Sequence, residues 1–245
     1  MRQTDLIKPY KKDHEVSYTS GAFATIELLQ SRPELLRQVF IHSAFEEHEQ
    51  LAEMCARHDI PVIRNDEAFR RIKQKENVYV AGVFEKYAQV LDASRAHAVL
   101  VNPADMGNLG TIIRTLAGLN ITDLAVISTA ADIFHPKTVR ASMGALFRLR
   151  FEAFEDFADY MARFPGHARY PFMLDGDPLP DLIQREQNPL FALIFGNEAR
   201  GLAPEYASIG QAVRIPQSPL TDSLNLSVAV GIGAYAFSSK YGLVA

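Results

Sequence analysis

The stretch His97-Ala-Val-Leu-Val-Asn-Pro-Ala-Asp-Met-Gly-Asn-Leu-Gly-Thr-Ile-Ile-Arg114 shows the pattern that decides the fold. It opens with a short apolar run, which is typical of a buried strand. Pro103 then turns the chain, and a helical pattern begins near Asn108, which we expect to be the N-cap of the helix. Gly110 and Arg114 are four residues apart and therefore share one helix face. The stretch predicts a strand, a turn and a helix.

The same alternation continues along the rest of the chain. Further strands are predicted at residues 123–128, 148–154, 171–175, 191–195 and 212–215. Further helices are predicted at residues 136–142, 156–164, 203–208 and 223–239. Apolar strands that alternate with helices predict an α/β fold with a mainly parallel sheet covered on both faces. In such sheets ligands bind at the carboxyl ends of the strands, so the loops after Val101, Phe195 and Ile215 are the candidates for chemistry.

The first 90 residues form a smaller alternating pattern. Strands are predicted at residues 39–42, 61–64 and 78–84, and helices at residues 21–29, 46–57 and 66–73. Residues 85–96 are polar and weakly periodic, which indicates a linker or a linking helix. We therefore expect two domains, at residues 1–90 and 91–245.

Composition excludes several classes of protein. The chain has 245 residues, of which 48% are hydrophobic, and its formal net charge is −4, which excludes a disordered or fibrous chain. No apolar stretch reaches the ~18 residues of a membrane span, and the N-terminus lacks an apolar signal core, so we expect a cytoplasmic protein without membrane contact. The single cysteine, Cys55, excludes an internal disulfide, and no histidine stands in metal-ligand spacing, so we expect no metal. The mild acidity leaves nucleic acid open, because binding needs only a local basic patch.

A second loop follows the strand that ends at Phe195. Gly196 permits close approach of the backbone to a ligand, and the next residues are Asn197 and Glu198. A carboxylate at a strand exit can accept hydrogen bonds from hydroxyls or hold an arginine. From the residues alone, an ordinary turn with Glu198 in water is an equally good interpretation.

A third loop, Arg214-Ile-Pro-Gln-Ser-Pro-Leu-Thr-Asp-Ser-Leu-Asn-Leu-Ser227, leads into a helix that is apolar nearly all round. Thr221, Asp222 and Ser223 can all cap this helix, which would place Ser223 and Asn225 in its first turn. A helix without a polar face is buried on several sides. It therefore belongs to the core, to a subunit interface, or to both.

Taken together, the three loops resemble the SpoU (TrmH-like) family of RNA ribose 2′-O-methyltransferases, which is part of the SPOUT class. The resemblance lies in Asn108-Leu-Gly-Thr-Ile-Ile-Arg114, Phe195-Gly-Asn-Glu-Ala-Arg-Gly201, and Ile215-Pro216 with Ser223-Leu-Asn-Leu-Ser-Val-Ala229. The segment Arg140-Ala-Ser-Met-Gly-Ala-Leu-Phe147 also looks like the family's stretch between these motifs. Residues 17–84 resemble, more loosely, the family's L30e-like substrate-binding domain.

The resemblance implies a C-terminal trefoil knot, a homodimer, S-adenosylmethionine as cofactor and RNA as substrate, with ribosomal RNA favoured over tRNA. It implies a cofactor site formed by Gly196, Asn197, Ile215, Gln217 and Leu224. It implies a catalytic group formed by Arg114, Asn108, Glu198, Ser223 and Asn225. Two positions depart from the family pattern: Gln217 stands where a methionine commonly follows Ile-Pro, and residues 78–82 lack the often-seen His-Gln-Gly.

Physical chemistry limits the role of Arg114. A guanidinium stays charged in proteins, so we expect Arg114 to grip an RNA phosphate and polarise the 2′-oxygen rather than act as a base. Basic residues such as Arg70, Arg71, Lys73 and Lys75 are candidates for further phosphate contacts. The alternative is a non-catalytic RNA-binding or ribosome assembly protein with a degenerate transferase domain. A Rossmann-type enzyme is disfavoured, because Gly107 and Gly110 do not form a Gly-x-Gly fingerprint.

Overall fold

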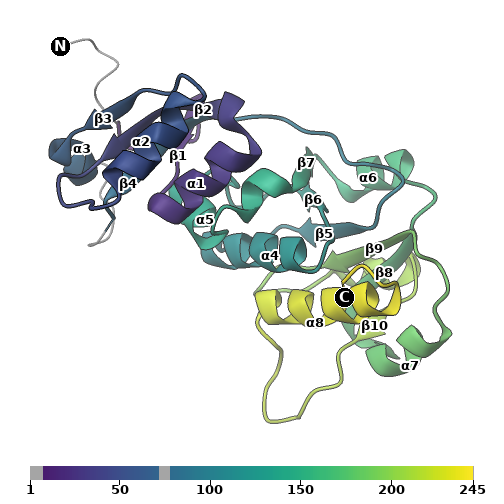
Figure 1. Cartoon of the computed structure of the whole chain (residues 1–245). Helices are drawn as coiled ribbons and strands as arrows, with labels where there is room; N and C mark the ends of the chain where they lie inside the picture. Colours follow the sequence, from purple (N-terminus) through teal and green to yellow (C-terminus); the bar gives the residue numbers. More distant parts are fainter. Residues whose placement is uncertain (1–7, 72–77, 245) are drawn as a thin grey trace. The chain divides into compact units, whose positions relative to one another are not determined.

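The computed structural model describes residues 8–71 and 78–244, which fold as two compact units (Figure 1). The first unit comprises the chain up to Tyr87 together with Asp132–Arg148. The second comprises Ala88–Ala131 and Leu149–Ala245. The segment 132–148, which the sequence places in the second domain, thus packs within the first unit. The chain passes from one unit to the other three times.

The first unit is built on a four-stranded sheet. Its strand order is β1 (Val16–Tyr18), β4 (Val80–Glu85), β2 (Leu36–Ile41) and β3 (Val62–Arg64), and within it β2 and β3 pair in parallel. The helices are α1 (Ala22–Ser31), the 3-10 helix η2 (Pro33–Leu35), α2 (His48–Ala56) and α3 (Asp66–Arg71). Three predicted strands and three predicted helices are confirmed, although Lys73 and Lys75 lie outside the described residues. Strand β1 was not predicted from the sequence.

The inserted segment supplies part of the core of the first unit. It carries α5 (Pro136–Ala141) and the 3-10 helix η3 (Ala145–Arg148). The ring of Phe147 packs edge-on against Phe84 of β4, with centroids 5.1 Å apart, and Phe134 lies 6.2 Å from the same ring. Phe84 is fully buried and Phe147 is 2% exposed. Residues remote in sequence therefore complete this hydrophobic core.

The second unit is built on a six-stranded parallel sheet. The strand order is β10 (Val213–Arg214), β8 (Ala168–Pro178), β9 (Phe191–Phe195), β5 (His97–Val101), β6 (Asp123–Ile127) and β7 (Arg150–Phe154). Every neighbouring pair is parallel, which confirms the predicted α/β fold. All residues of β5, β6 and β9 are buried, as expected for central strands covered on both faces. The trefoil knot stays a prediction.

The helices of the second unit correct several details of the sequence prediction. They are α4 (Met106–Gly118), α6 (Phe157–Arg163), α7 (Leu179–Arg185), the 3-10 helix η4 (Pro204–Ser208) and α8 (Leu226–Lys240). The N-cap of α4 is Asp105, whose side chain accepts from the backbone N–H of Asn108, so the expectation that Asn108 caps the helix is wrong. The predicted helix at residues 203–208 is the 3-10 helix η4, α7 was not predicted, and residues 86–96 contain no helix.

The surroundings of helix α8 explain why its sequence is apolar nearly all round. Val230, Ala234 and Phe237 are fully buried, and the helix packs against α4. Val228, Ile232 and Tyr235, by contrast, are 48%, 38% and 60% exposed. These three residues recur at helical spacing and form one exposed apolar stripe, the α8 stripe. Of the helices in the described ranges, none is long and apolar enough to cross a membrane.

Candidate active site

The three candidate loops all follow the carboxyl ends of strands of the parallel sheet. Strand β5 pairs with β6 on one side and with β9 on the other, so the chain reverses its direction of winding at β5. In open α/β sheets the crevice at such a switch point, outside the carboxyl ends of the strands, binds ligands. The loops that follow β5 and β9 are therefore neighbours at the place where binding is expected.

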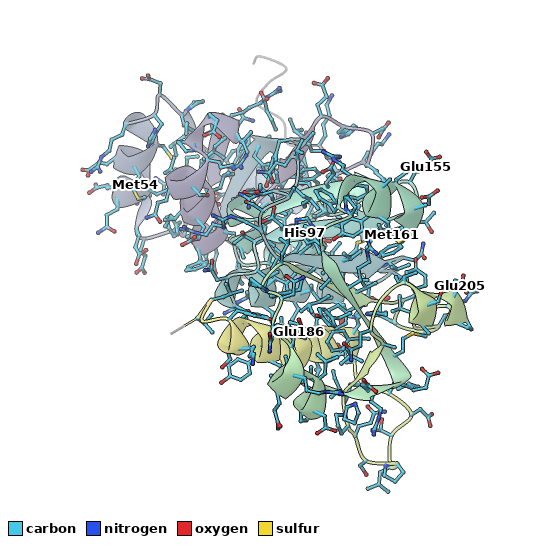
Figure 2. The ribbon with its side chains drawn as sticks, turned by 90° about the vertical axis from the view of Figure 1, so that its right-hand side faces the viewer. Met54, His97, Glu155, Met161, Glu186 and Glu205 are labelled. Carbon is cyan, nitrogen blue, oxygen red and sulfur yellow. The ribbon has the colours of Figure 1, made fainter. Side chains whose placement is uncertain are left out.

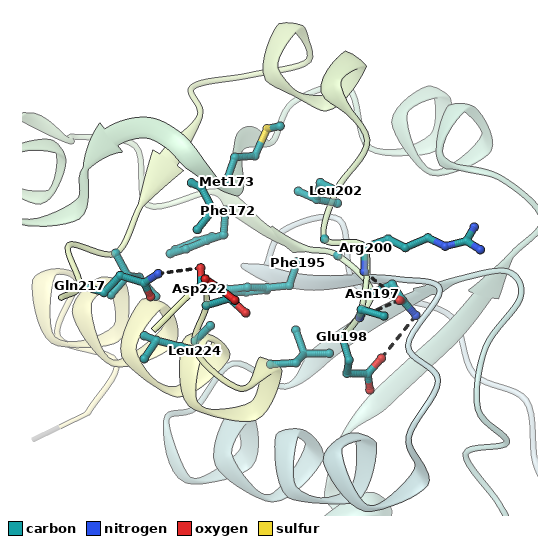
Figure 3. Close-up of a pocket in the computed structure, with 18 of the residues that line it drawn as sticks. Phe172, Met173, Phe195, Asn197, Glu198, Arg200, Leu202, Gln217, Asp222 and Leu224 are labelled. Carbon is teal, nitrogen blue, oxygen red and sulfur yellow. Dashed lines mark hydrogen bonds between the residues drawn. The ribbon is translucent and has the colours of Figure 1, made fainter. Parts of the chain in front are cut away.

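A cavity of about 620 Å³ opens at the carboxyl ends of the strands (Figure 3). It is lined by residues 172–175 in the middle of β8, by the loop after β9, and by the loop between β10 and α8 with the first turn of α8. The rings of Phe172 and Phe195 stack beside it with centroids 4.3 Å apart. Gly233 of α8 lies directly behind them, because a Cβ atom there would come within 2.6 Å of Phe172. The cavity thus has an aromatic wall fixed by α8.

The loop after β9 is a tight turn. Asn197 and Gly201 exchange backbone hydrogen bonds of 3.2 and 2.9 Å, and the side chain of Asn197 accepts from the N–H of Ala199 and donates to Asn102 O. A Cβ atom on Gly196 would lie 2.1 Å from the carbonyl carbon of Gly201. Glycine is therefore required at 196 by the turn itself, and its expected role in close approach to a ligand stays a prediction.

Glu198 binds the start of α4. Its carboxylate accepts from the backbone N–H groups of Ala104 and Asp105, both at 3.0 Å, and from Asn108 Nδ2 at 3.3 Å. Burial alone would raise the pKa of Glu198, but these donors outweigh burial and hold the pKa below its ordinary value. Glu198 is therefore an ionised, hydrogen-bonded group and not a side chain in free water.

Asn108 and Asn225 extend this network to the third loop. Asn225 Nδ2 donates to Asn108 Oδ1 at 3.3 Å, while Asn225 Oδ1 accepts from the N–H of Ser227 at 2.8 Å. Asn225 is thus the N-cap of α8. The structure joins Glu198, Asn108 and Asn225, one from each loop, into a single hydrogen-bonded chain.

The other predicted residues separate into two groups. Seven of the ten predicted site residues line the cavity: Gly196, Asn197, Glu198, Ile215, Gln217, Ser223 and Leu224. Gln217 Nε2 donates to the carbonyl of Asp222 at 3.2 Å and closes the base of the third loop. Ser223 precedes the cap, so its expected position in the first turn is wrong. Arg114 is exposed on α4 and does not line the cavity.

Sequence reasoning missed part of the lining. Phe172 and Asp175 come from β8, whose sequence carries no recognisable motif, and only the strand order brings them to the cavity. Arg200 stands inside the predicted second loop but was given no role. Among the described lining residues Arg200 is the one cation, against three carboxylates, Asp175, Glu198 and Asp222. In the same ranges no three His, Cys, Asp or Glu side chains gather as a metal site would require.

Comparison with known proteins identifies the family to which the second unit is similar. The model of the SpoU rRNA Methylase family matches residues 95–235. An uncharacterized tRNA/rRNA methyltransferase of Synechocystis is 29% identical over 143 residues, which cover 58% of this chain and 52% of that protein. A 23S rRNA guanosine 2′-O-methyltransferase of Bacillus subtilis is 26% identical over 175 residues, or 70% of this chain and 69% of that protein.

A solved structure extends the likeness to both units. An AdoMet-bound rRNA methyltransferase from Sinorhizobium meliloti superposes with a TM-score of 0.76 and 26% identity, covering 94% of this chain and 89% of that chain. The matched region spans about half the length of the Synechocystis relative and of its mycobacterial counterparts.

Proposed function

This chain belongs to the SpoU rRNA methylase family, and we propose that it transfers a methyl group from S-adenosylmethionine to a ribose 2′-hydroxyl of RNA. The observation that carries the proposal is a cavity lined by the second and third loops, to which the hydrogen bonds of Asn108 with Glu198 and Asn225 join the first loop.

The cavity fits S-adenosylmethionine in size and charge. Its volume of about 620 Å³ falls within the usual ~300–1,000 Å³ of small-molecule sites. Phe172, which stacks on the buried ring of Phe195, would offer apolar ring surface to a nucleobase, while Asp175 and Asp222 would balance the positive charge of a sulfonium and an ammonium group. Ile215, Gln217 and Leu224 would hold the molecule from the third loop. When bound, it supplies a methyl group activated by the positively charged sulfur.

The residues of the chain would then position the acceptor. Holding the ribose oxygen in line with the methyl group accounts for much of the rate of such a displacement. Glu198, Asn108 and Asn225 fix the rims of the cavity relative to each other, so that the loops need not reorganise when RNA binds. Arg114 would grip an RNA phosphate and polarise the 2′-oxygen, and the proton would leave to phosphate or water.

A homodimer is part of the proposal. The α8 stripe exposes three apolar side chains in a row, which is unfavourable unless another surface covers them. Gly231 lies between Val228 and Tyr235 and faces Thr115, the neighbour of Arg114. The stripe therefore adjoins the part of α4 that carries Arg114. A second copy seated there would complete the site with Arg114 at the interface.

Ribosomal RNA is the substrate that we favour over tRNA, and the bacterial cytoplasm is the compartment. The Bacillus subtilis relative is named for 23S rRNA, and it matches more of this chain than the uncharacterized relatives do. The 2′-hydroxyl distinguishes RNA from DNA, which makes RNA the polymer suited to this chemistry.

The test is direct. The purified protein is incubated with tritiated S-adenosylmethionine and unmodified 16S or 23S rRNA transcripts, and 2′-O-methyl positions are mapped. We expect label at one ribose of one RNA, and none with Arg114→Ala, which should keep its fold and its cofactor affinity. Cofactor binding by calorimetry without any transfer to RNA would favour the non-catalytic alternative.

A further inference from the structure

Arg200 is a charged side chain that the proposed function has not used. It lies in the turn between Asn197 and Gly201, where its own backbone N–H donates to Asn197 Oδ1 at 3.3 Å. Gly201, with a φ of +67°, closes the turn behind it. The side chain is exposed, and its guanidinium points away from Phe195 and past Asn197 (Figure 3). The backbone is therefore fixed while the charged end is available.

The guanidinium of Arg200 has no counter-ion in the part of the chain that the structure describes. Arg150 of the same unit binds Asp123, and Arg185 lies 3.4 Å from Asp177, whereas Arg200, like Arg114, forms no ion pair within the described ranges. The nearest acid in sequence, Glu198, is occupied by the backbone of α4. Arg200 thus keeps its planar set of donors, which suits a phosphate group.

The acidic residues of the cavity lining would repel RNA unless a cation such as Arg200 lay beside them. Asp175 and Asp222 are both exposed lining residues. They favour a cationic methyl donor, but they repel the phosphate that accompanies any ribose brought to the cavity. The 2′-hydroxyl is one carbon away from the carbon that bears the 3′-phosphate, so the acceptor cannot approach without that charge. A cation in the lining removes the conflict.

We propose that Arg200 binds the RNA phosphate next to the ribose that is methylated. This inference rests on the proposed function and adds an RNA-binding residue to it. Arg200 differs from Arg114 in place: it belongs to the cavity lining of the same chain, whereas Arg114 lies on α4 outside the lining. Asp175 and Asp222 would then favour binding of the cationic methyl donor, and Arg200 would bind the phosphate of the RNA that accepts the methyl group.

The experiment compares Arg200→Ala, Arg200→Lys and Arg200→Glu with the wild type. Arg185→Ala is the matched control, because Arg185 is an exposed arginine of the same unit outside the cavity. For each protein we measure KM for the rRNA transcript, the dependence of RNA affinity on salt, the Kd for S-adenosylmethionine by calorimetry, and Tm.

Arg200→Ala should raise KM for RNA roughly tenfold and lower the slope of log affinity against log salt by about one, as expected for one lost phosphate contact. Arg200→Lys should raise KM for RNA less than Arg200→Ala does, and Arg200→Glu should raise it more. The Kd for S-adenosylmethionine should not rise and Tm should not change, since the turn uses only the backbone of Arg200. Arg185→Ala should match the wild type.

An active wild type with an Arg200→Ala variant of unchanged KM and salt slope would overturn the Arg200 proposal alone. A loss of cofactor affinity or of Tm in that variant would also overturn it, because Arg200 would then serve the cofactor or the fold. A wild type that neither binds S-adenosylmethionine nor methylates either transcript would overturn the proposed function, and the Arg200 proposal with it.

Discussion

Glu198 organises the site through one carboxylate. Its two oxygens take three donors from the loop and first turns around α4, and each of these donors would otherwise need water. Hydrogen bonds to an ionised acceptor are stronger than those between neutral groups. Glu198 therefore fixes where α4 begins relative to the turn after β9.

Replacing Glu198 by glutamine tests this role. Glu198→Gln keeps the size of the side chain but removes its charge and turns one acceptor into a donor that faces backbone N–H groups. We expect a loss of about 1–3 kcal/mol in the free energy of unfolding at pH 7, together with lower methyl transfer. Urea unfolding followed by circular dichroism, and a transfer assay, check both effects. Glu205→Gln, on an exposed residue of η4, is the control and should change neither.

The stabilisation that Glu198 contributes to the fold should decrease as the pH falls. Because the pKa of Glu198 is lowered in the folded protein, its stabilisation is complete above the ordinary value of 4.5 and is lost as the pH falls through the lowered pKa. A stability difference between wild type and Glu198→Gln that does not shrink in acid would contradict the network.

His97 is a buried polar residue at the opposite ends of the strands, inside the second unit (Figure 2). Its Nε2 lies 2.9 Å from the carbonyl of Asp92, so this nitrogen donates, and Nδ1 accepts from Tyr160 Oη at 3.0 Å. His167 stacks on the ring with centroids 4.1 Å apart. Burial lowers the pKa of His97 to about 4, so the residue is neutral in the native state.

A neutral buried histidine predicts acid sensitivity. Between pH 6.5 and about 4 the unfolded chain binds a proton that folded His97 does not, so stability should fall as the pH falls through this window. At pH 5 the loss is about 2 kcal/mol relative to pH 7. His97→Gln should be less stable at pH 7 yet show a flatter profile. Urea titrations at pH 7 and pH 5 measure the free energy of unfolding of each variant. His58→Gln, on an exposed histidine, is the control and should lose as much stability between the two pH values as the wild type.

Among the elements, α5 and η3 stand out because their segment belongs to the first unit, although the residues before and after it in the sequence belong to the second. It leaves the sheet of the second unit after β6, completes the core of the first unit around Phe84, and returns to form β7. The first unit therefore depends on residues that lie more than 40 positions beyond its own last strand.

Phe147→Ala tests this dependence. Removing a large, buried aromatic side chain leaves a cavity against Phe84, and we expect a loss of about 3–5 kcal/mol in the free energy of unfolding of the first unit. The chain has no tryptophan, so circular dichroism and tyrosine fluorescence are the probes of urea unfolding. Phe23→Ala on α1 is the matched control, because Phe23 is 55% exposed and should contribute little. Equal losses in both variants would show that the segment is not part of this core.

Periodicity in the sequence predicted the elements that are long or wholly apolar. Strands β5 and β9 have the predicted boundaries, because buried parallel strands are unbroken apolar runs. It could not predict contacts between distant residues: that Glu198 holds the start of α4, or that β8 lines the cavity. Cap positions shifted by a few residues, since Asp105 and Asn225 compete with several other residues able to cap.

At the scale of the whole molecule, we propose that the α8 stripe is the surface through which two copies of the chain associate. We expect the wild type to sediment as a dimer, at twice the chain mass of 27.3 kDa. Val228→Asp and Tyr235→Asp place a charge on the stripe without entering the core, so each should shift the equilibrium to monomer by at least roughly tenfold in Kd, the equivalent of ~1.4 kcal/mol. Analytical ultracentrifugation measures this. Val90→Asp, on a residue that is 60% exposed elsewhere, should remain dimeric.

The threefold passage of the chain between its two units limits how such a protein can be recombined. A chimera that exchanged residues 1–90 for those of a relative would keep the host's Phe134 and Phe147 against a foreign strand. The first unit is therefore difficult to transplant by joining gene fragments at a single junction. Both the leading segment and the short internal one must be exchanged together, so the two have to change in step during divergence.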